Sequence, residues 1–477
     1  MTTLSPSQTE INSVIALYSN GQIQEALNAI ETLTKSYPNN PVLYNISGAC
    51  YANLGQLDTA VKNYEKTLTI KPNYAEAHNN LGGTLQELGQ LDAAVTSYEK
   101  ALAIKPDFIE AHNNLGNAFK ELGQMDAAVK SYEKAIAIKP DYADAHNNLG
   151  NAFKKLGQLD TAVKSYEKAL AIKPDFAETF NNLCNALKEL NQLDTAVKSY
   201  EQILAMNPDY AEAHNNLGVT RKELDQHDAA IKCFEKALVI KPDFVEAHYN
   251  LGVTLQELDE HDAAVKCFEQ ALAINPDYAE AHNHLGNVLN DLGQHDAAVK
   301  SYEKTLTLKP DYAEVHNNLG LTLMELGQLD DAIKCYEKTL TLKPDFAEAH
   351  NNLGLAHMQL DQLEVSIRSF DKALAIKPDF AEAYSNHGIL MMILNRMDKA
   401  LVSFKRALAL NPELNFLLGN LLHSKMHLCV WDDLPNDLNE LQNKINNNEK
   451  VIEPFSMLGL IDDPELQRKV AEIFTNK

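Results

Sequence analysis

Several features that mark secreted and membrane proteins are scarce in this chain. Only six of its 477 residues are cysteine and none forms a CxxC pair, so no disulfide framework is expected. No stretch approaches the roughly 18 consecutive apolar residues that a membrane-spanning helix needs. The first ten residues contain neither a basic group nor an apolar run, unlike a signal peptide. The sequence therefore predicts a cytoplasmic protein that does not bind membranes.

A surplus of basic residues is also missing. Asp and Glu number 66 and Lys and Arg only 42, which gives a net charge of -24. Proteins that bind nucleic acids or anionic lipid surfaces neutralise phosphate groups with excess cations. Nucleic acid is therefore not expected as a partner of this chain.

Sequence motifs of catalysis and cofactor binding are absent as well. The chain has no HExxH, no GxSxG, no phosphate-binding loop and no dinucleotide-binding GxGxxG. We therefore predict no catalytic residue, no cofactor and no metal site, and we do not expect the chain alone to be an enzyme.

Proline reveals what the sequence does contain, which is a strict repeat. Twelve of the 17 prolines lie 34 residues apart, without any insertion between them. They are Pro38, Pro72, Pro106, Pro140, Pro174, Pro208, Pro242, Pro276, Pro310, Pro344, Pro378 and Pro412. A fixed period of this length is typical of a solenoid. With positions 1 to 34 counted from Ala75, twelve repeats occupy residues 7–414 and follow an N-terminal tail of residues 1–6.

Each repeat reads as two helices. Positions 1–14 and 17–30 are expected to be helical, and position 15 holds Gly, Asn or Asp in every repeat. These three residue types best tolerate the left-handed backbone that ends a helix. Proline at position 32 separates the second helix from the next repeat because it cannot donate a backbone hydrogen bond.

Small and aromatic residues recur at fixed places inside the two helices. Position 8 is Gly in ten repeats, position 20 is Ala in eleven, and position 24 is aromatic in most, as in Gly82, Ala94 and Tyr98. Small residues let the helices approach closely, so these positions should form the core that stacked repeats share. The pattern resembles the tetratricopeptide repeat (TPR) family across residues 7–414. That resemblance implies an all-α, right-handed superhelical solenoid of helix pairs, whose first helices line a concave groove that binds peptides or proteins.

Asparagine dominates the expected groove face of the first helix. By helical periodicity, positions 2, 5, 6, 9, 12 and 13 share one stripe. Position 6 is Asn in most repeats, among them Asn80, Asn114, Asn148, Asn182, Asn216, Asn250, Asn318, Asn352 and Asn386. A side-chain amide offers both a donor and an acceptor, which suits the main chain of an extended peptide. The alternative is that these amides are merely solvated and were copied along with the repeat.

Other groove positions change along the chain. Position 12 is Lys120, Lys154 and Lys188 in early repeats, but Met324, Met358 and Met392 in the last three. Flexible Met beside Leu favours an adaptable binding surface, unless neighbouring repeats bury these side chains. Position 2 is acidic in ten consecutive repeats, whereas TPR domains that clamp a terminal carboxylate carry Lys there. A chaperone adaptor of that kind is therefore not expected.

Histidine recurs at position 4, where a helix core usually takes a flat aromatic residue. We expect these side chains to be packing residues: His78, His112, His146, His214, His248, His282, His316 and His350. Equivalent sites in adjacent repeats should lie about 10 Å apart, the usual distance between packed helices. Metal–ligand bonds of about 2.0–2.3 Å cannot span that separation.

The repeat pattern fades after Pro412. Residues 415–446 are expected to form a degenerate thirteenth helix pair, followed by a C-terminal segment, 447–477. The stretches KMHLCVWDD (425–433) and EPFSMLGLIDDPELQRKVAEIF (453–474) resemble the region that joins the TPR array to the catalytic lobes in bacterial relatives of O-GlcNAc transferase and SPINDLY. The asparagines at position 6 agree with the asparagine ladder of that family. None of the family's catalytic residues is present to be carried over.

Two functions therefore stay open. The first is an interaction scaffold that binds an extended polypeptide in the groove. The second is the substrate-recruiting portion of a protein O-GlcNAc transferase-like glycosyltransferase whose catalytic part is truncated or encoded separately. The expected partners are protein or peptide clients, and either a separate catalytic subunit or a second copy at the C-terminal segment. That last expectation rests on an exposed apolar cluster over residues 451–461, unless residues 463–474 cap the array and bury it.

Overall fold

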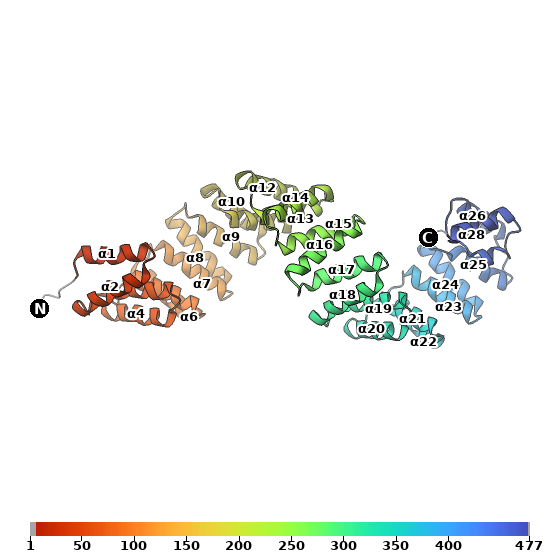
Figure 1. The fold of residues 1–477 in the computed structure, drawn as a ribbon, viewed down its shortest axis with the longest axis horizontal. Coiled ribbons are helices and arrows are strands. Elements are labelled where there is room, and N and C mark those ends of the chain that lie inside the picture. The colour runs from red at the N-terminus through yellow and green to blue at the C-terminus, as the bar shows by residue number, and fades with distance from the viewer. Residues whose placement is uncertain (1–5, 476–477) are drawn as a thin grey trace. The chain divides into compact units, whose positions relative to one another are not determined.

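The computed structural model describes residues 6–475, and every regular element in that range is a helix. The chain divides into two compact halves, an N-terminal half that ends at Pro242 and a C-terminal half that begins at Asp243. Within each half, successive helix pairs stack in chain order (Figure 1). The predicted all-α solenoid of helix pairs is confirmed.

The helices of the N-terminal half follow the repeat. They are α1 (Gln8–Ser19), α2 (Ile23–Ser36), α3 (Pro41–Asn53), α4 (Leu57–Ile70), α5 (Ala75–Glu87), α6 (Leu91–Ile104), α7 (Ile109–Glu121), α8 (Met125–Ile138), α9 (Ala143–Lys155), α10 (Leu159–Ile172), α11 (Ala177–Glu189), α12 (Leu193–Met206), α13 (Ala211–Lys222) and α14 (His227–Ile240).

The C-terminal half continues the same alternation before it departs from the repeat. Its helices are α15 (Val245–Glu257), α16 (His261–Ile274), α17 (Ala279–Asp291), α18 (His295–Leu308), α19 (Ala313–Glu325), α20 (Leu329–Leu342), α21 (Ala347–Gln359), α22 (Leu363–Ile376), α23 (Ala381–Ile393), α24 (Met397–Leu410), α25 (Leu417–His427), α26 (Leu434–Asn446), α27 (Pro454–Met457) and α28 (Pro464–Thr475).

The turn between the two helices of a repeat has the backbone that position 15 predicts. Gly89 has φ of +73° and Gly327 of +72°. Where the repeat has Asn or Asp instead, φ is equally positive, as at Asn191 (57°) and Asp361 (58°). The left-handed conformation is therefore common to the turns, whichever of the three residue types supplies it.

Glycine at position 8 makes room for the aromatic ring at position 24. A Cβ atom on Gly116 would lie 2.5 Å from Cε1 of Tyr132, and one on Gly354 would lie 2.7 Å from Cε1 of Phe370. Real Cβ atoms essentially never come so close to another carbon. The ring of Tyr132 is fully buried, as is the position-20 alanine, Ala128. This ring-on-glycine contact joins the first and second helices of a repeat.

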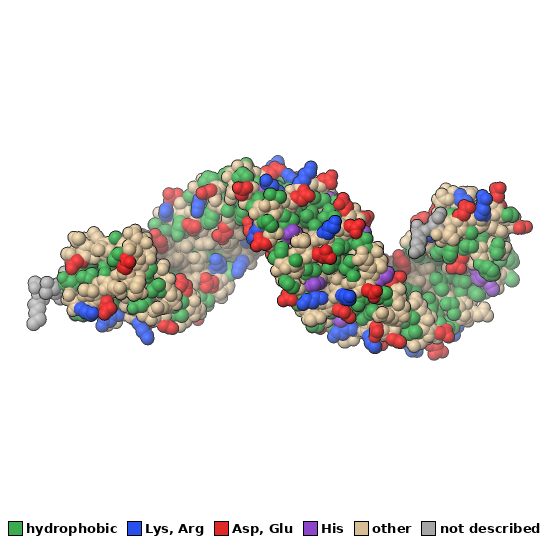
Figure 2. Space-filling model, in the orientation of Figure 1, with side chains coloured by type: hydrophobic (Ala, Val, Ile, Leu, Met, Phe, Trp, Pro, Cys, Tyr) green, Lys and Arg blue, Asp and Glu red, His purple; other side chains and the backbone are tan. Residues whose placement is uncertain are grey.

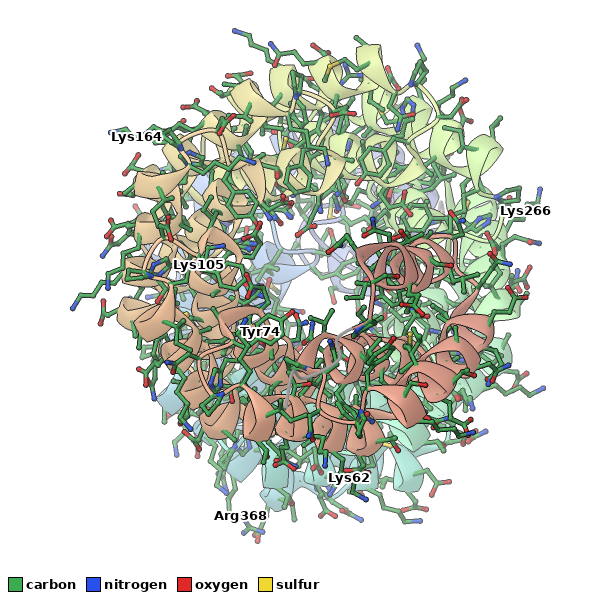
Figure 3. The ribbon with its side chains drawn as sticks, turned by 90° about the vertical axis from the view of Figure 1, so that its left-hand side faces the viewer. Lys62, Tyr74, Lys105, Lys164, Lys266 and Arg368 are labelled. Carbon is green, nitrogen blue, oxygen red and sulfur yellow. The ribbon has the colours of Figure 1, made fainter. Side chains whose placement is uncertain are left out.

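In the first repeats of the N-terminal half, α1, α3, α5 and α7 border a common hollow, and we call this side of the stack the inner side. In the N-terminal half, Lys164 on α10 points outward, whereas Tyr74, which precedes α5, lies nearer the inner side (Figure 3). Acidic and basic side chains are interspersed over the face drawn in Figure 2. The exposed charges therefore do not form a single basic surface there.

The C-terminal segment folds back on α25. Val451, Ile452 and Met457 are buried, together with Leu466 and Val470 of α28, in one cluster with the last helix pairs. The expectation that the whole 451–461 cluster is exposed is therefore wrong, because α28 covers much of it.

Two apolar side chains of that segment do remain exposed. Phe455 is 86% exposed and Leu458 is 59% exposed. The N-terminal tail predicted for residues 1–6 lies almost entirely outside the described residues.

Candidate functional site

The inner helices of the N-terminal half border a hollow of about 580 Å³. Its lining comes mainly from α1, α3, α5 and α7, with Tyr64 of α4, and includes the asparagines Asn45, Asn79, Asn80 and Asn114. Gly83 adds no side chain, and a Cβ there would meet only the Tyr98 hydroxyl, at 3.7 Å. Asn80 and Asn114, two of the asparagines expected to face a ligand, therefore border this hollow.

The position-6 asparagines are hydrogen-bonded to the repeat before them. In seven of them the side-chain Nδ2 donates to Oδ1 of the asparagine at position 5 of the preceding repeat. The pairs are Asn80–Asn45 (3.4 Å), Asn114–Asn79 (3.2 Å), Asn148–Asn113 (3.1 Å), Asn182–Asn147 (3.1 Å), Asn216–Asn181 (2.6 Å), Asn352–Asn317 (3.1 Å) and Asn386–Asn351 (3.0 Å). We call each such pair a rung of the asparagine ladder.

The rungs show that these amides are more than solvated side chains. The position-5 members are mostly buried, with Asn113 7% and Asn147 3% exposed. The position-6 members are mostly half-buried, as at Asn114 and Asn148. An amide has two N–H donors and an acceptor oxygen, and a rung uses one of the donors. Asn114 and Asn148 therefore keep hydrogen-bonding capacity beyond the rung itself.

The ladder is interrupted in the C-terminal half. Tyr249 replaces the position-5 asparagine and His284 replaces its position-6 partner, and their rings meet edge to face at 5.5 Å between centroids. His284 Nδ1 lies 2.9 Å from Gln256 Oε1. In the next repeat, Asn318 donates to Asn287 (3.2 Å) instead of Asn283. Asn250 occupies position 6 on α15 and is half-buried.

Position 9 has a role that the sequence pattern alone did not suggest. Asn117 Oδ1 accepts from the buried Tyr132 hydroxyl at 2.7 Å, and Asn151 does the same for Tyr166 at 2.8 Å. Where position 24 is Phe, as at Phe370, position 9 is apolar, as at Leu355. Part of the signal was present in the sequence, because asparagine at position 9 always occurs with tyrosine at position 24. The reverse does not hold, as at Tyr64, Tyr98 and Tyr336.

The position-12 lysines make ion pairs between repeats. Lys154 Nζ lies 2.8 Å from Glu189 Oε1, and Lys188 Nζ lies 3.0 Å from Glu223 Oε1. Each acceptor sits at position 13 of the following repeat. For Lys120 that position is occupied by Lys155. Partly exposed pairs of this kind contribute little to stability, so they chiefly set the charge along the groove edge.

The position-12 methionines lie at the boundary between core and surface. The Tyr336 hydroxyl lies 3.1 Å from Met324 Sδ, so the sulfur takes the place of the asparagine acceptor of other repeats. Met358 and Met392 are partly buried against the apolar cluster of the last helix pairs. Neighbouring residues therefore cover part of each side chain and leave part accessible.

The recurring histidines at position 4 are held by backbone carbonyls. His112 Nε2 lies 2.9 Å from the carbonyl oxygen of Pro106, and His350 Nε2 lies 3.1 Å from that of Pro344. Burial lowers the pKa of His350, and its hydrogen bond to Pro344 opposes this only in part. These side chains are structural, and no group of metal-ligating residues occurs within residues 6–475. Across the same range, no helix has the length and apolar character to span a membrane.

Family comparisons match the array nearly throughout. The TPR repeat family matches residues 48–89, 84–123, 116–157, 184–225, 220–259, 286–327 and 320–361. Further tetratricopeptide repeat matches cover residues 143–176, 245–278, 267–300, 347–380 and 381–414. A search of curated proteins found no match.

Solved structures similar to this chain are TPR proteins or assemblies of helical repeats. MamA is 30% identical over 35% of this chain and 97% of its own, with a TM-score of 0.33. YrrB, described as a TPR protein with an unusual peptide-binding site, is 24% identical over 39% of this chain and 95% of its own, with a TM-score of 0.34. The Cut9–Hcn1 hetero-tetramer of APC/C is 15% identical over 88% and 97%, with a TM-score of 0.45. On the family matches, this chain is a member of the tetratricopeptide repeat family.

Proposed function

We propose that this protein is an interaction scaffold that binds an extended polypeptide along its inner helices. TPR repeats are typical of protein–protein interaction scaffolds. The observation that carries the proposal is the asparagine ladder beside the hollow of the N-terminal half. Its amides are held in place by their rungs, so binding would not have to order free side chains.

The ladder suits a ligand's main chain more than its side chains. Asn80 and Asn114 line the hollow, and each position-6 amide has a donor and an acceptor oxygen that the rung does not use. Peptide groups present the matching pair at regular spacing along an extended chain. Binding of a client polypeptide by the asparagine ladder would therefore depend only weakly on the amino-acid sequence of the client.

The test uses peptides selected against the protein from a random 12-residue library. N-methylation of single peptide bonds in a selected peptide removes one main-chain donor without altering the protein. Each methylation opposite the ladder should weaken binding by about 0.5–1.5 kcal/mol, the net worth of a neutral hydrogen bond. Titration calorimetry measures the change.

A protein variant complements the peptide series. Replacing Asn80, Asn114 and Asn148 with Ala should weaken the same peptides, while Lys164→Ala on the outer side should not. If neither the methylated peptides nor the triple variant differ from their controls, the ladder does not hold the client main chain.

The glycosyltransferase-related function remains a second hypothesis. It rests on the resemblance of residues 425–433 and 453–474 alone, because the family matches end at residue 414. A separate catalytic subunit or a second copy would bind near Phe455 and Leu458, the exposed apolar residues of that segment. Addition of this chain to the catalytic region of such an enzyme should raise glycosylation of a protein acceptor; no increase would refute it.

A further inference from the structure

Six repeats place their own lysine over an aromatic ring at the end of the repeat. The lysine is at position 31 and the ring at position 34. The distances from Nζ to the ring centroid are 4.5 Å for Lys71–Tyr74, 4.6 Å for Lys105–Phe108, 5.5 Å for Lys139–Tyr142, 4.6 Å for Lys173–Phe176, 4.8 Å for Lys343–Phe346 and 4.7 Å for Lys377–Phe380. A cation this close to a ring face is attracted by the electrons of the ring.

Three of these lysines, Lys105, Lys343 and Lys377, also meet the acidic residue at position 2 of their repeat. Lys377 Nζ lies 2.8 Å from Glu348 Oε1, and Lys343 Nζ lies 3.3 Å from Glu314 Oε1. Position 2 and position 34 thus form a binding site for an ammonium group, with a carboxylate on one side and an aromatic face on another.

The repeat 245–278 has this site but not the lysine. Glu246 and Tyr278 occupy positions 2 and 34, whereas position 31 is Asn275. Glu246 and Asn275 are exposed, so the site is open to solvent. The two acidic residues that flank Tyr278 already have cationic partners, because Lys304 pairs with Asp277 at 3.3 Å and Lys309 pairs with Glu280. Within residues 6–475, no basic side chain forms an ion pair with Glu246.

A second ring is added in this repeat. Position 5 is aromatic only here, and the ring of Tyr249 lies 4.9 Å from that of Tyr278, centroid to centroid, at a tilt of 44°. Burial raises the pKa of Tyr278 to about 12, with smaller contributions from Tyr249, Glu280 and Glu246. The site therefore combines two half-buried aromatic faces with an unneutralised carboxylate.

We propose that Glu246, Tyr249 and Tyr278 bind a basic side chain, arginine or lysine, of the client polypeptide. The bound cation would take the place that the chain's own lysine takes in six other repeats. This rests on the proposed function as a polypeptide scaffold, and it assigns one side-chain class to the client. The strength expected from the rings is that of a cation–π contact, which corresponds to about a 2- to 30-fold preference for a cation over a neutral isostere.

The repeat 177–210 provides an internal contrast. It also lacks the lysine, with Asn207 at position 31, and it keeps Glu178 and Tyr210. Its position 5 is asparagine, so it has one ring only. Asn147 Nδ2 donates to Glu178 Oε1 at 3.4 Å, so that carboxylate already has a contact from the preceding repeat. A basic side chain should therefore prefer the repeat 245–278.

The experiment uses two small probes, N-acetyl-arginine methylamide and its citrulline counterpart, which has the same shape without the charge. Binding to the full chain, labelled with carbon-13 at tyrosine Cζ, is followed by NMR. The Tyr249 and Tyr278 signals are assigned by their loss in Tyr249→Asn and Tyr278→Phe. The arginine probe should shift both signals and bind about 2- to 30-fold more tightly than the citrulline probe.

Asn275→Lys is the decisive variant, because it restores the lysine that the other repeats carry and so should fold. It should abolish the preference for the arginine probe, and Asn207→Lys should leave that preference unchanged. Equal binding of the two probes, or a preference that survives Asn275→Lys, would overturn the proposal. Because neither probe is a polypeptide, failure here is distinct from failure of the main-chain binding tested with N-methylated peptides.

Discussion

The two halves of the chain have the same kind of core within their repeats, but the contacts on the inner face differ. In the N-terminal half, rungs of the asparagine ladder join each repeat to the next from Asn45 to Asn216. In the C-terminal half, the Tyr249–His284 contact replaces a rung and Asn318 is diverted to Asn287. The ring-on-glycine contact, by contrast, is the same in both halves.

This difference shows which positions physical packing constrains. At the core glycines an added Cβ would lie 2.5–2.7 Å from a ring of the same repeat, so a substitution there requires the ring or the helix to shift. Only the repeat 177–210 places a larger residue, Cys184, beside a retained Tyr200. The inner face has no such limit, and a rung can be replaced when both of its members change, as at Tyr249 and His284. Ligand recognition can therefore vary along the array while the scaffold stays constant.

The largest effect should come from the shared core. Gly150→Val and Gly354→Val each place a Cβ within 2.5–2.7 Å of a buried ring. Each should destabilise its repeat by about 3 kcal/mol, at the upper end of the cost of overpacking. Hydrogen exchange of the helix amides reads the effect locally in each half. If the two substitutions changed the free energy of local unfolding by amounts that differ several-fold, the two halves would not have the same kind of core.

A matched substitution at the turn serves as control. Gly157 has φ of +73°, and a Cβ atom added there would have no neighbour within 4 Å. Asparagine already occupies this position at Asn191 and Asn395, with similar φ. Gly157→Asn should therefore change hydrogen exchange only slightly.

A smaller loss of stability should distinguish repeats with Tyr at position 24, whose hydroxyl needs an acceptor, from repeats with Phe there. Asn151→Leu removes the acceptor of the buried Tyr166 hydroxyl and should cost about 2 kcal/mol, because the hydroxyl is left without a partner. Adding Tyr166→Phe should recover most of that loss, since the double variant copies the Leu355 and Phe370 pair of the C-terminal half. Urea denaturation of the single and double variants gives the coupling. Additive losses would argue against the hydroxyl as the cause.

The smallest effect should come from single amides of the ladder. Asn147→Ala removes the acceptor of the Asn182 rung and should cost about 1 kcal/mol. Asn283→Ala in the interrupted stretch should cost less, because Asn283 Oδ1 is buried without a hydrogen-bond partner. The same hydrogen-exchange measurement compares the two. An equal or larger loss at Asn283 would mean that the interruption has no energetic consequence.

Much of the fold could be predicted because the residues within each repeat determine its helices, its turn and its core. The turn at position 15 follows from the conformational preference of Gly, Asn and Asp, and the core follows from small residues opposite aromatic ones. The candidate site was predicted only as a stripe. Periodicity placed Asn114 and Asn148 on the inner face, but it could not show that they bond to Asn79 and Asn113 of the preceding repeat.

Contacts between repeats were the part that helical periodicity could not supply. They depend on how far one helix pair is displaced from the next. That displacement cannot be calculated from the 34-residue length of the repeat. The exposure of the C-terminal segment could not be predicted for a related reason. Whether Val451 and Ile452 are exposed depends on the docking of α28, which has no equivalent among the repeats from which its position could be inferred.

The spacing of the ladder has a consequence for how the chain reaches its folded state. Each rung joins residues 35 positions apart, and each ring-on-glycine contact lies within one repeat. Formation of a rung therefore closes a loop of about one repeat and never one that spans the chain of 477 residues. Proteins dominated by such near-neighbour contacts fold fast for their size, and repeat arrays can nucleate at any point and grow outward. The slow step for this chain should then be the docking of α28 on the helices after Pro412, a region that does not follow the repeat.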